Sequence, residues 1–353
     1  MVLIRPFEEN DSADILSMEK LCPQGNENYA MGADKSPNPA ARYDLYENSK
    51  FLVAEEKGKV VGSIGWAVKK SSKGNNYIYL AEVNIHPDFR KLGIASKLVE
   101  EVEKYAHDKN VDHIYCYIFE PNIASKSLFT KLSYFNPLDF QACALATYKE
   151  AKILGKFKIE KLKRKEIPEA VDLINNYYKG RDHFLPYTVE TFENYVNSIP
   201  KYGLDNFWAV KDNSEMVACA GLWDSSELAK ICFSKEPFSF KVMQKTFQFL
   251  SNFTKMPNLP AEGEYFNLYM TADHAFKPGN EESILSLIKY FNNLMVESNE
   301  SFFIINLDPK DVLLKIIREL RPQIDKWSVY SKSFGKDLGN INQIYVDIRD
   351  MVL

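Results

Sequence analysis

Blocks of apolar and polar residues follow one another along this chain in an order that occurs twice. The first half predicts a strand, a helix, a hairpin, a strand, a helix and a strand, at 2–6, 10–22, 51–70, 76–87, from Arg90 or Lys91, and 113–119. The second half predicts the same order for a strand, helix, hairpin, strand, helix and strand at 156–162, 164–178, 206–226, 265–274, 281–297 and 302–307. A duplicated mixed α/β unit explains this repetition more economically than chance. We therefore expect two domains, 1–150 and 151–353, with a boundary near residues 148–157.

The totals describe an ordinary soluble globular protein. The chain has 353 residues, of which 45% are hydrophobic and 26% charged, with a net charge of −4. Such a charge provides no general attraction to nucleic acid or to an anionic membrane, so neither is expected as a partner. The start of the chain lacks a secretory pattern, and no window holds about 18 uninterrupted apolar residues. The expected location is the cytoplasm.

Cysteine and histidine do not form a metal-binding pattern. The five cysteines lack CxxC spacing and read as reduced, mostly buried thiols. The five histidines are scattered, so no metal is expected.

Two segments lie outside the repeat. Residues 23–50 are polar and rich in turn formers, and a connection of this length is either a functional lid or a loose insertion. Both interpretations remain open for that segment. Residues 156–165 are basic, which favours a solvated edge strand and helix cap over a nucleic-acid patch.

The stretch HPDFRKLGIASKLVEEV, residues 86–102, joins an apolar strand to an amphipathic helix. A turn before a helix presents unpaired N–H groups at the positive end of the helix dipole, which suits a diphosphate. Gly93 allows close approach of the main chain, Ala95 is small, and Arg90 and Lys91 add positive charge. The turn lacks the Gly-Lys-Ser/Thr of a Walker loop, and no GxGxxG opens the domain. An ordinary strand-to-helix connection with a packing glycine is the alternative.

The wider context of this turn resembles the GNAT superfamily of acyl-CoA-dependent N-acetyltransferases. That family writes its coenzyme turn as Gln/Arg-x-x-Gly-x-Gly/Ala, which Arg90–Ala95 matches, after a strand end that Ile85–Pro87 matches. An Asn-led helix with a Leu-Gly-Phe-like end follows in the family, and Asn122 and Leu132–Tyr134 match it. The match is strong over about 51–136 and plausible from residue 2, whereas the second copy matches in element order only. The resemblance implies an α/β (mixed α+β) fold of two GNAT-like domains, each a twisted mixed sheet with a splayed central strand pair flanked by helices.

The resemblance also implies a function: an acyltransferase that uses acetyl-CoA as co-substrate and acetylates an amine by direct attack in a ternary complex. By analogy with the family, Val83, Asn84 and Ile85 would bind the pantetheine arm and direct an N–H at the acetyl oxygen. The residues that would hold the pyrophosphate beside Arg90 and Lys91 are Leu92, Gly93, Ile94, Ala95 and Ser96. Asn122 would reach the arm, although helix capping alone would also explain an Asn there. The alternative function is a non-catalytic, regulatory CoA-binding module.

Phe129 is the main departure from the family, because many members have a tyrosine at this place as general acid. Phe129 would still line the coenzyme site, and the proton would come from Tyr117, Tyr134 or solvent. Glu82 is the candidate base, since an acid in an apolar setting has a raised pKa, and a packed ion pair is the alternative. His86 and His113 read as structural residues at strand ends.

The second copy lacks the coenzyme motif. Residues 274–283 read HAFKPGNEES, with Glu281 and Glu282 where a pyrophosphate needs positive charge. We therefore expect the N-terminal domain alone to be active and the second to be a degenerate scaffold, with Trp208, Trp223 and Phe233 in its core. The sequence does not choose between a small-molecule and a peptide amine acceptor, or between a monomer and a homodimer.

Overall fold

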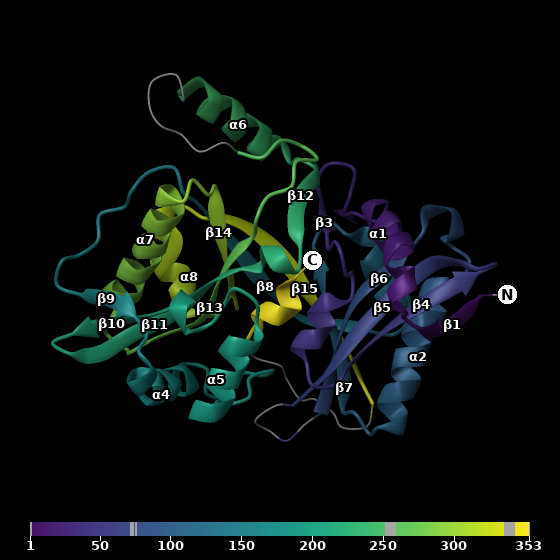
Figure 1. The fold of residues 1–353 in the computed structure, drawn as a ribbon, viewed down its shortest axis with the longest axis horizontal. Helices are drawn as coiled ribbons and strands as arrows, with labels where there is room; N and C mark the ends of the chain where they lie inside the picture. The colour runs from purple at the N-terminus through teal and green to yellow at the C-terminus, as the bar shows by residue number, and fades with distance from the viewer. Residues whose placement is uncertain (1, 71–73, 75, 251–258, 335–342, 353) are drawn as a thin grey trace.

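The computed structural model describes residues 2–70, 74, 76–250, 259–334 and 343–352. The N-terminal half contains the helices α1 (Ser12–Lys20), α2 (Ile94–Asp108) and α3 (Ile123–Lys131). Its strands are β1 (Leu3–Pro6), β2 (Gln24–Gly25), β3 (Ala30–Asp34), β4 (Ser49–Glu56), β5 (Lys59–Lys70), β6 (Asn76–Ile85), β7 (His113–Phe119) and β8 (Phe135–Ala146). Figure 1 shows this half in purple to blue on the right.

The C-terminal half repeats the order, as the sequence pattern predicts. Its helices are α4 (Ile167–Tyr177), α5 (Val189–Ser198), α6 (Phe238–Leu250), α7 (Glu281–Glu297) and α8 (Val312–Ile316). Its strands are β9 (Lys158–Lys161), β10 (Phe207–Asp212), β11 (Glu215–Asp224), β12 (Lys230–Lys235), β13 (Tyr269–Phe276), β14 (Phe302–Leu307) and β15 (Gln323–Ser333). The basic run at 156–165 contains β9, which is an edge strand of the main sheet.

The two halves share one sheet because they exchange their last strands. The sheet has 12 strands in the order β1-β4-β5-β6-β7-β15-β8-β14-β13-β11-β10-β9. Strand β15 of the C-terminal half is thus inserted between β7 and β8, with Trp327 opposite both Phe119 and Phe140. Strand β8 of the N-terminal half pairs in turn with β14. The mixed sheets with flanking helices that the resemblance implies are confirmed, and the strands of the two halves join in one continuous sheet.

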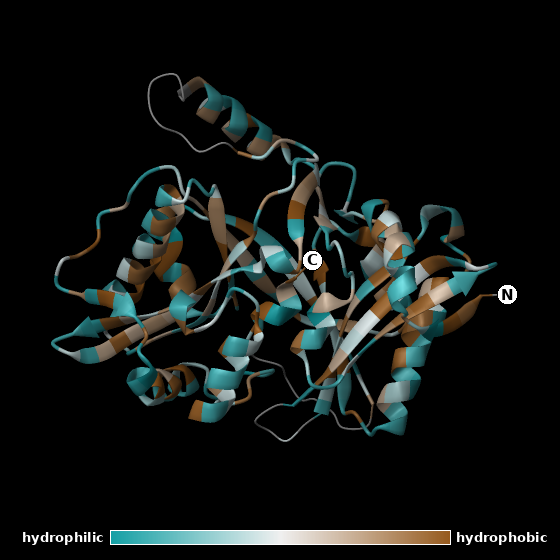
Figure 2. Ribbon diagram, viewed as in Figure 1, coloured by the Kyte–Doolittle hydropathy of each residue, from teal (hydrophilic) through white to brown (hydrophobic). Residues whose placement is uncertain are grey.

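The sheet buries an apolar core on each face. Helices α2 and α3 cover one face in the N-terminal half, and α7 and α8 cover the same face in the C-terminal half. The opposite face packs against α4, α5, the segment before β4 and the end of the chain. Figure 2 shows mostly hydrophobic colours along the central strands and hydrophilic colours in the outer loops. Trp208, Trp223 and Phe233 are buried, as predicted.

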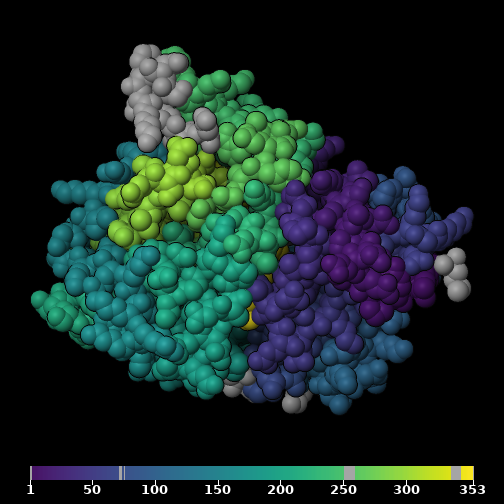
Figure 3. Space-filling model, in the orientation of Figure 1, coloured from purple at the N-terminus to yellow at the C-terminus, as the bar shows by residue number. Residues whose placement is uncertain are grey.

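The end of the chain, residues 343–352, lies between the halves and contacts both. The Tyr345 hydroxyl donates to Asp273 in the C-terminal half at 2.6 Å. Asp350 accepts from Lys69 and Tyr115 in the N-terminal half at 2.8 and 2.6 Å. Yellow atoms of the C-terminal part are visible in the seam of the space-filling view (Figure 3).

Segment 23–50 is folded onto the body of the protein. Strand β3 lies between β2 and β12 in a separate three-stranded sheet. Of these strands, β12 belongs to the C-terminal half. This packing agrees with the interpretation of 23–50 as a lid and disagrees with a loose insertion.

Candidate functional site

A groove opens where two central strands separate. Strands β6 and β7 pair in parallel only from Tyr77 opposite His113 to Tyr79 opposite Tyr115. Beyond these pairs β6 keeps its bonds to β5, but its edge toward β7 is unpaired. The resulting groove spans about 1550 Å³, part of it open to solvent. It is lined by Cys22–Gly25, Leu80–Ile85, Arg90, Lys91, Ala95, Cys116–Ile118, Asn122, Ala124, Ser125, Ser127–Phe129 and Lys131. It thus brings together most of the residues that the sequence assigns to the coenzyme.

A bulge in β6 shapes the wall of this groove. Glu82 has φ of 58°, and the register with β5 shifts between Ser63 and Gly65. A β-bulge re-aims the following residues, so it changes the direction of the Val83 and Asn84 backbone groups along the open edge. An exposed strand edge of this kind can pair with a peptide-like arm.

The Glu82 side chain belongs to a buried cluster of four charges. Its Oε1 atom lies 3.0 Å from Lys35 Nζ and 3.1 Å from Arg42 NH1, and Lys35 also lies 3.2 Å from Glu19. All four side chains are at most 6% exposed. The neighbouring acids raise the pKa of Lys35, although its burial acts in the opposite direction. The ion pair that the sequence left as the alternative for Glu82 is present, while its Oε2 has no hydrogen-bond partner among the described residues.

The turn at the head of α2 has the geometry of an anion site. Lys91 and Gly93 are left-handed, with φ of 63° and 80°, so the helix begins at Ile94 and not at the predicted Arg90 or Lys91. The Lys97 amide donates to the Gly93 carbonyl, which closes the first turn of the helix. The amides of 94–96 come before this bond, so they have no acceptor within the helix. Arg90 Nε donates to the Ile85 carbonyl at 3.1 Å, which attaches the turn to the end of β6. A second hollow beside the groove is lined by the residues of this turn, from Arg90 to Ser96. Leu92 is the exception, because its side chain is exposed.

The helix after β7 supplies the far wall of the groove. Asn122 caps α3 by accepting from the Ser125 amide at 3.1 Å, and it also lines the groove. Phe129 is buried and lies edge-on to Tyr134 at 5.0 Å between ring centroids. Tyr134 packs away from the groove, with Lys332 5.5 Å above its ring.

Tyr117 is the tyrosine that lines the groove. Burial raises the pKa of Tyr117 well above its ordinary value, so the phenol carries its proton at neutral pH. Its hydroxyl has no hydrogen-bond partner among the described residues. Tyr117 is therefore a protonated hydrogen-bond donor on the wall of the groove.

The two histidines take structural places, as predicted. His86 accepts from the Asp88 amide at 3.3 Å after the end of β6. His113 stacks on Tyr77 at 5.1 Å, and burial lowers its pKa to about 4.

The equivalent opening in the C-terminal half is nearly closed. Strands β13 and β14 also pair over three residues and then separate, but the space between them is only about 330 Å³. Arg181 NH1 lies 2.6 Å from Asp311 Oδ2 there, and the Tyr177 hydroxyl donates to Asp311 at 2.5 Å. At the head of α7, Glu282 forms an ion pair with Lys156, and Glu281 accepts from the Gly279 amide at 3.3 Å.

The described residues provide neither a metal site nor a membrane-spanning helix. Among them, no group of three or more His, Cys, Asp and Glu side chains is arranged to hold a metal ion. None of the described helices is both long and apolar enough to cross a membrane.

Three features define the class of the protein. They are a duplicated α/β unit, two parallel strands that separate, and a glycine turn that leads from the first of these strands into a helix. The acetyltransferase (GNAT) family matches residues 15–134. An acetyltransferase of Photorhabdus laumondii is 30% identical over 131 residues, which cover 37% of this chain and 85% of that protein. The chain belongs to the GNAT acetyltransferase family, an enzyme family whose members use acetyl-CoA, and this confirms the resemblance seen in the sequence.

Other similarities extend the comparison. An acetyltransferase of Pectobacterium atrosepticum is 37% identical over 84 residues, 24% of this chain, and the chain spans only 56% of that relative. A tandem GNAT protein from the clavulanic acid biosynthesis pathway is similar in fold over 96% of this chain and 100% of its own, with a TM-score of 0.58 and 10% identity. This last similarity confirms the tandem architecture.

Lys35, Arg42 and Glu19 are site residues that the sequence analysis did not single out. Lys35 and Arg42 lie in the segment 23–50, and a long polar segment placed between two predicted elements was the signal available. Sequence spacing does not predict the contacts of Lys35 and Arg42 with Glu82, because they join residues 40 or more positions apart.

Proposed function

We propose that the protein is an acetyl-CoA-dependent N-acetyltransferase whose N-terminal half, residues 1–150, binds the co-substrate and acetylates an amine by direct attack in a ternary complex. The observation that carries the proposal is the open groove between β6 and β7, which ends at the amides of the α2 turn. The C-terminal half, residues 151–353, then serves as a degenerate scaffold.

The chain's own residues suit the co-substrate. Acetyl-CoA supplies an activated acetyl group together with a diphosphate and a peptide-like arm. The amides of 94–96, with Arg90 and Lys91, would hold the diphosphate. The unpaired edge at Val83–Ile85 would pair with the arm, and an N–H there would stabilise negative charge on the acetyl oxygen.

Two residues are the proposed proton carriers. Tyr117 is the proposed donor to the departing sulfur, since it lines the groove and its protonated hydroxyl has no hydrogen-bond partner among the described residues. Glu82 is the proposed base through its free Oε2, with Lys35 and Arg42 keeping the carboxylate in place.

The proposal is tested by thiol release from acetyl-CoA with a panel of amines, beside calorimetric binding of CoA. We expect micromolar binding and turnover on at least one amine. Phe129 favours the second candidate, a CoA-binding module without catalysis, and binding without turnover on any amine would support it. Absence of CoA binding would contradict both.

The role of Glu82 is tested by Glu82→Gln. If Glu82 is the base, turnover falls at least tenfold and the acid limb of the pH–rate profile changes. A profile of unchanged shape would leave Glu82 as an ion-pair residue only.

A further inference from the structure

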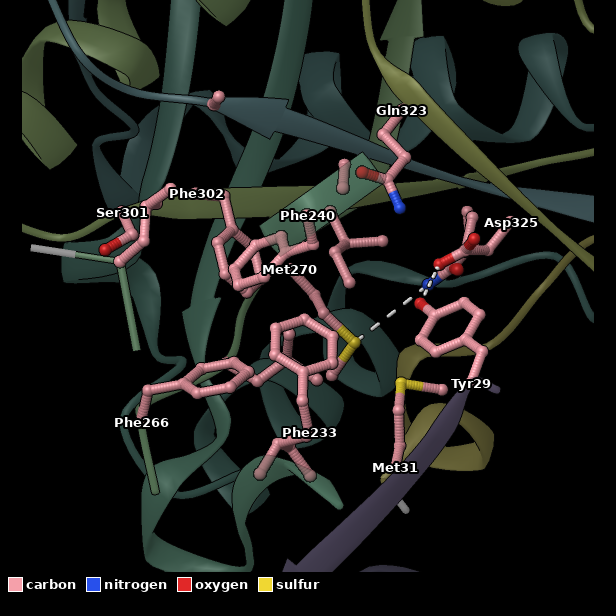
Figure 4. Close-up of a pocket in the computed structure, with 18 of the residues that line it drawn as sticks. Tyr29, Met31, Phe233, Phe240, Phe266, Met270, Ser301, Phe302, Gln323 and Asp325 are labelled. Atoms are coloured by element: carbon pink, nitrogen blue, oxygen red, sulfur yellow. Dashed lines mark hydrogen bonds between the residues drawn. The ribbon is translucent and has the colours of Figure 1, made fainter. Parts of the chain in front are cut away.

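A second large cavity lies outside the coenzyme groove, on the opposite face of the sheet from α7. The space between its walls amounts to about 1000 Å³, part of it open to solvent. Strands β8, β14 and β15 form its floor, and β3, β12 and α6 form its roof. Figure 4 shows apolar side chains around most of its wall, with Gln323, Asp325 and Tyr29 at one side and Ser301 at the other. Its lining includes Met31, Ala142, Ala144, Ala146, Ile231, Phe233, Phe240, Met243, Phe266, Met270, Phe302 and Ile304.

The cavity exists because of the residues that the strand exchange places at its floor. Ala142, Ala144 and Ala146 are alternate residues of β8, so they present only methyl groups on one face. The roof above them is built from large rings, with Phe233 4.5 Å from Phe240 and 5.5 Å from Phe266 between centroids. A floor of methyl groups under a roof of rings leaves a flat apolar space suited to a ring or a short alkyl chain.

One end of the cavity carries a carboxylate without a cation. Among the described lining residues Asp325 is the only acid, and its Oδ2 accepts from the Tyr29 hydroxyl at 2.6 Å. Among the described residues no Lys, Arg or His forms an ion pair with it. Arg321, the one cation among the described lining residues, stands four positions before Asp325 and is exposed. Burial raises the pKa of Asp325. An anion in apolar surroundings is costly unless a positive group pairs with it.

The Asp325 end of the cavity is the end nearest to the coenzyme groove. Tyr29 lines the cavity and packs edge-on against Phe119 at 4.9 Å between centroids. Phe119 lies two residues beyond Tyr117, which lines the groove, and their side chains share a face of β7. The segment from Cys22 to Met31 separates the two spaces, with Cys22–Gly25 on the groove side and Tyr29 and Met31 on the cavity side.

We propose that this cavity is the acceptor site and that it takes a primary amine on an apolar ring or short alkyl body, whose ammonium form pairs with Asp325. This inference rests on the proposed function, because it names the acceptor class for that reaction. The apolar body lies between the β8 alanines and the phenylalanines of the roof. The amine end points toward the partition beside Tyr29, from which it enters the groove.

Calorimetry on the full chain, with and without CoA, tests the site. The probes are 2-phenylethylamine, the matched alcohol 2-phenylethanol, and the polar polyamine spermidine. We expect 2-phenylethylamine to bind at least tenfold more tightly than either of the others. Asp325→Asn, which keeps the side-chain volume, should remove this advantage over the alcohol. Ala144→Leu should abolish binding of the amine because it fills the floor.

Both variants should bind CoA as the unchanged chain does, which also reports that they are folded. Equal binding of amine and alcohol to the unchanged chain, or an undiminished preference in Asp325→Asn, would overturn the proposal even if Ala144→Leu does not fold. Amine binding without any CoA binding would instead support this cavity and contradict the proposed function.

Discussion

Glu82 in the N-terminal half and Asp273 in the C-terminal half occupy equivalent places. Each is a buried acid with positive φ at a bulge, in the strand that separates from its parallel neighbour. Each bulge faces a glycine of the preceding strand that is covered by a tyrosine ring, Tyr43 over Gly65 and Tyr202 over Gly221. The backbone of the coenzyme groove is therefore present twice.

The side chains around the two bulges differ. Glu82 pairs with two cations, whereas Asp273 accepts from three tyrosine hydroxyls, those of Tyr187, Tyr202 and Tyr345. The residue that caps the next helix differs as well. Asn122 is neutral and borders an open groove, while Asp311 caps α8 and is paired with Arg181. We infer that a neutral cap and an unfilled strand opening distinguish a coenzyme site from a scaffold built on the same backbone.

The largest expected effect comes from blocking the coenzyme turn. Gly93→Trp should weaken CoA binding at least a thousandfold, because the indole would occupy the place of the diphosphate. The control is Gly279→Trp in the other half, where the glycine has φ of 81° against 80° for Gly93, and both have open space at the Cβ position. Both variants carry the same strain of about 1–2 kcal/mol. Calorimetry with CoA should show full affinity in Gly279→Trp, and loss of affinity there as well would contradict the difference between the halves.

The next effect concerns the ion pair that closes the C-terminal opening. Asp311→Asn should lower the free energy of unfolding by about 3 kcal/mol, because it leaves Arg181 buried without its partner. Asn122→Ala removes only a cap and should cost about 1 kcal/mol. Urea unfolding measures both values, and calorimetry should show weaker CoA binding only for Asn122→Ala. A stable Asp311→Asn variant that gained CoA affinity would mean that this ion pair alone closes a second coenzyme site.

The pH dependence of stability tests the acid at the C-terminal bulge. Burial raises the pKa of Asp273 to about 6 from its ordinary value of 3.8. The folded state therefore holds this proton more tightly than the unfolded state, so the contribution to stability is full below pH 3.8 and is lost as pH rises through 6. The loss is about 3 kcal/mol. Asparagine does not titrate, so Asp273→Asn should not lose stability in this way. Urea unfolding should show that the stability of this variant relative to the unchanged chain increases between pH 4 and pH 7. A constant difference over that range would contradict the raised pKa.

The sequence predicted the repeated order of elements and the coenzyme turn, because apolar period, a glycine and a family motif are local signals. It did not predict strands β8 and β15 or their exchange, since the pairing of Trp327 with Phe119 and Phe140 joins residues about 190–210 positions apart. The same limit applies to the Lys35–Glu82–Arg42 cluster and to the apolar cavity under Phe233. Phe233 was expected in the core, and it is buried, yet its ring also forms the cavity roof. Such sites depend on contacts between distant segments, which no local pattern encodes.

The smallest expected effect tests which tyrosine serves the N-terminal groove. Tyr117→Phe should lower kcat about tenfold or more while the KM for acetyl-CoA changes little, because the ring remains and only the donor is lost. The matched control is Tyr134→Phe, which removes the hydroxyl of a buried tyrosine that lies outside the groove lining. Steady-state kinetics with the best amine should give an unchanged kcat for this control. Equal losses in both variants would point to a general effect of the aromatic cluster, and no loss in Tyr117→Phe would leave solvent as the proton source. In either case the open strand edge would still distinguish the two halves, because that difference depends on backbone pairing and not on the donor.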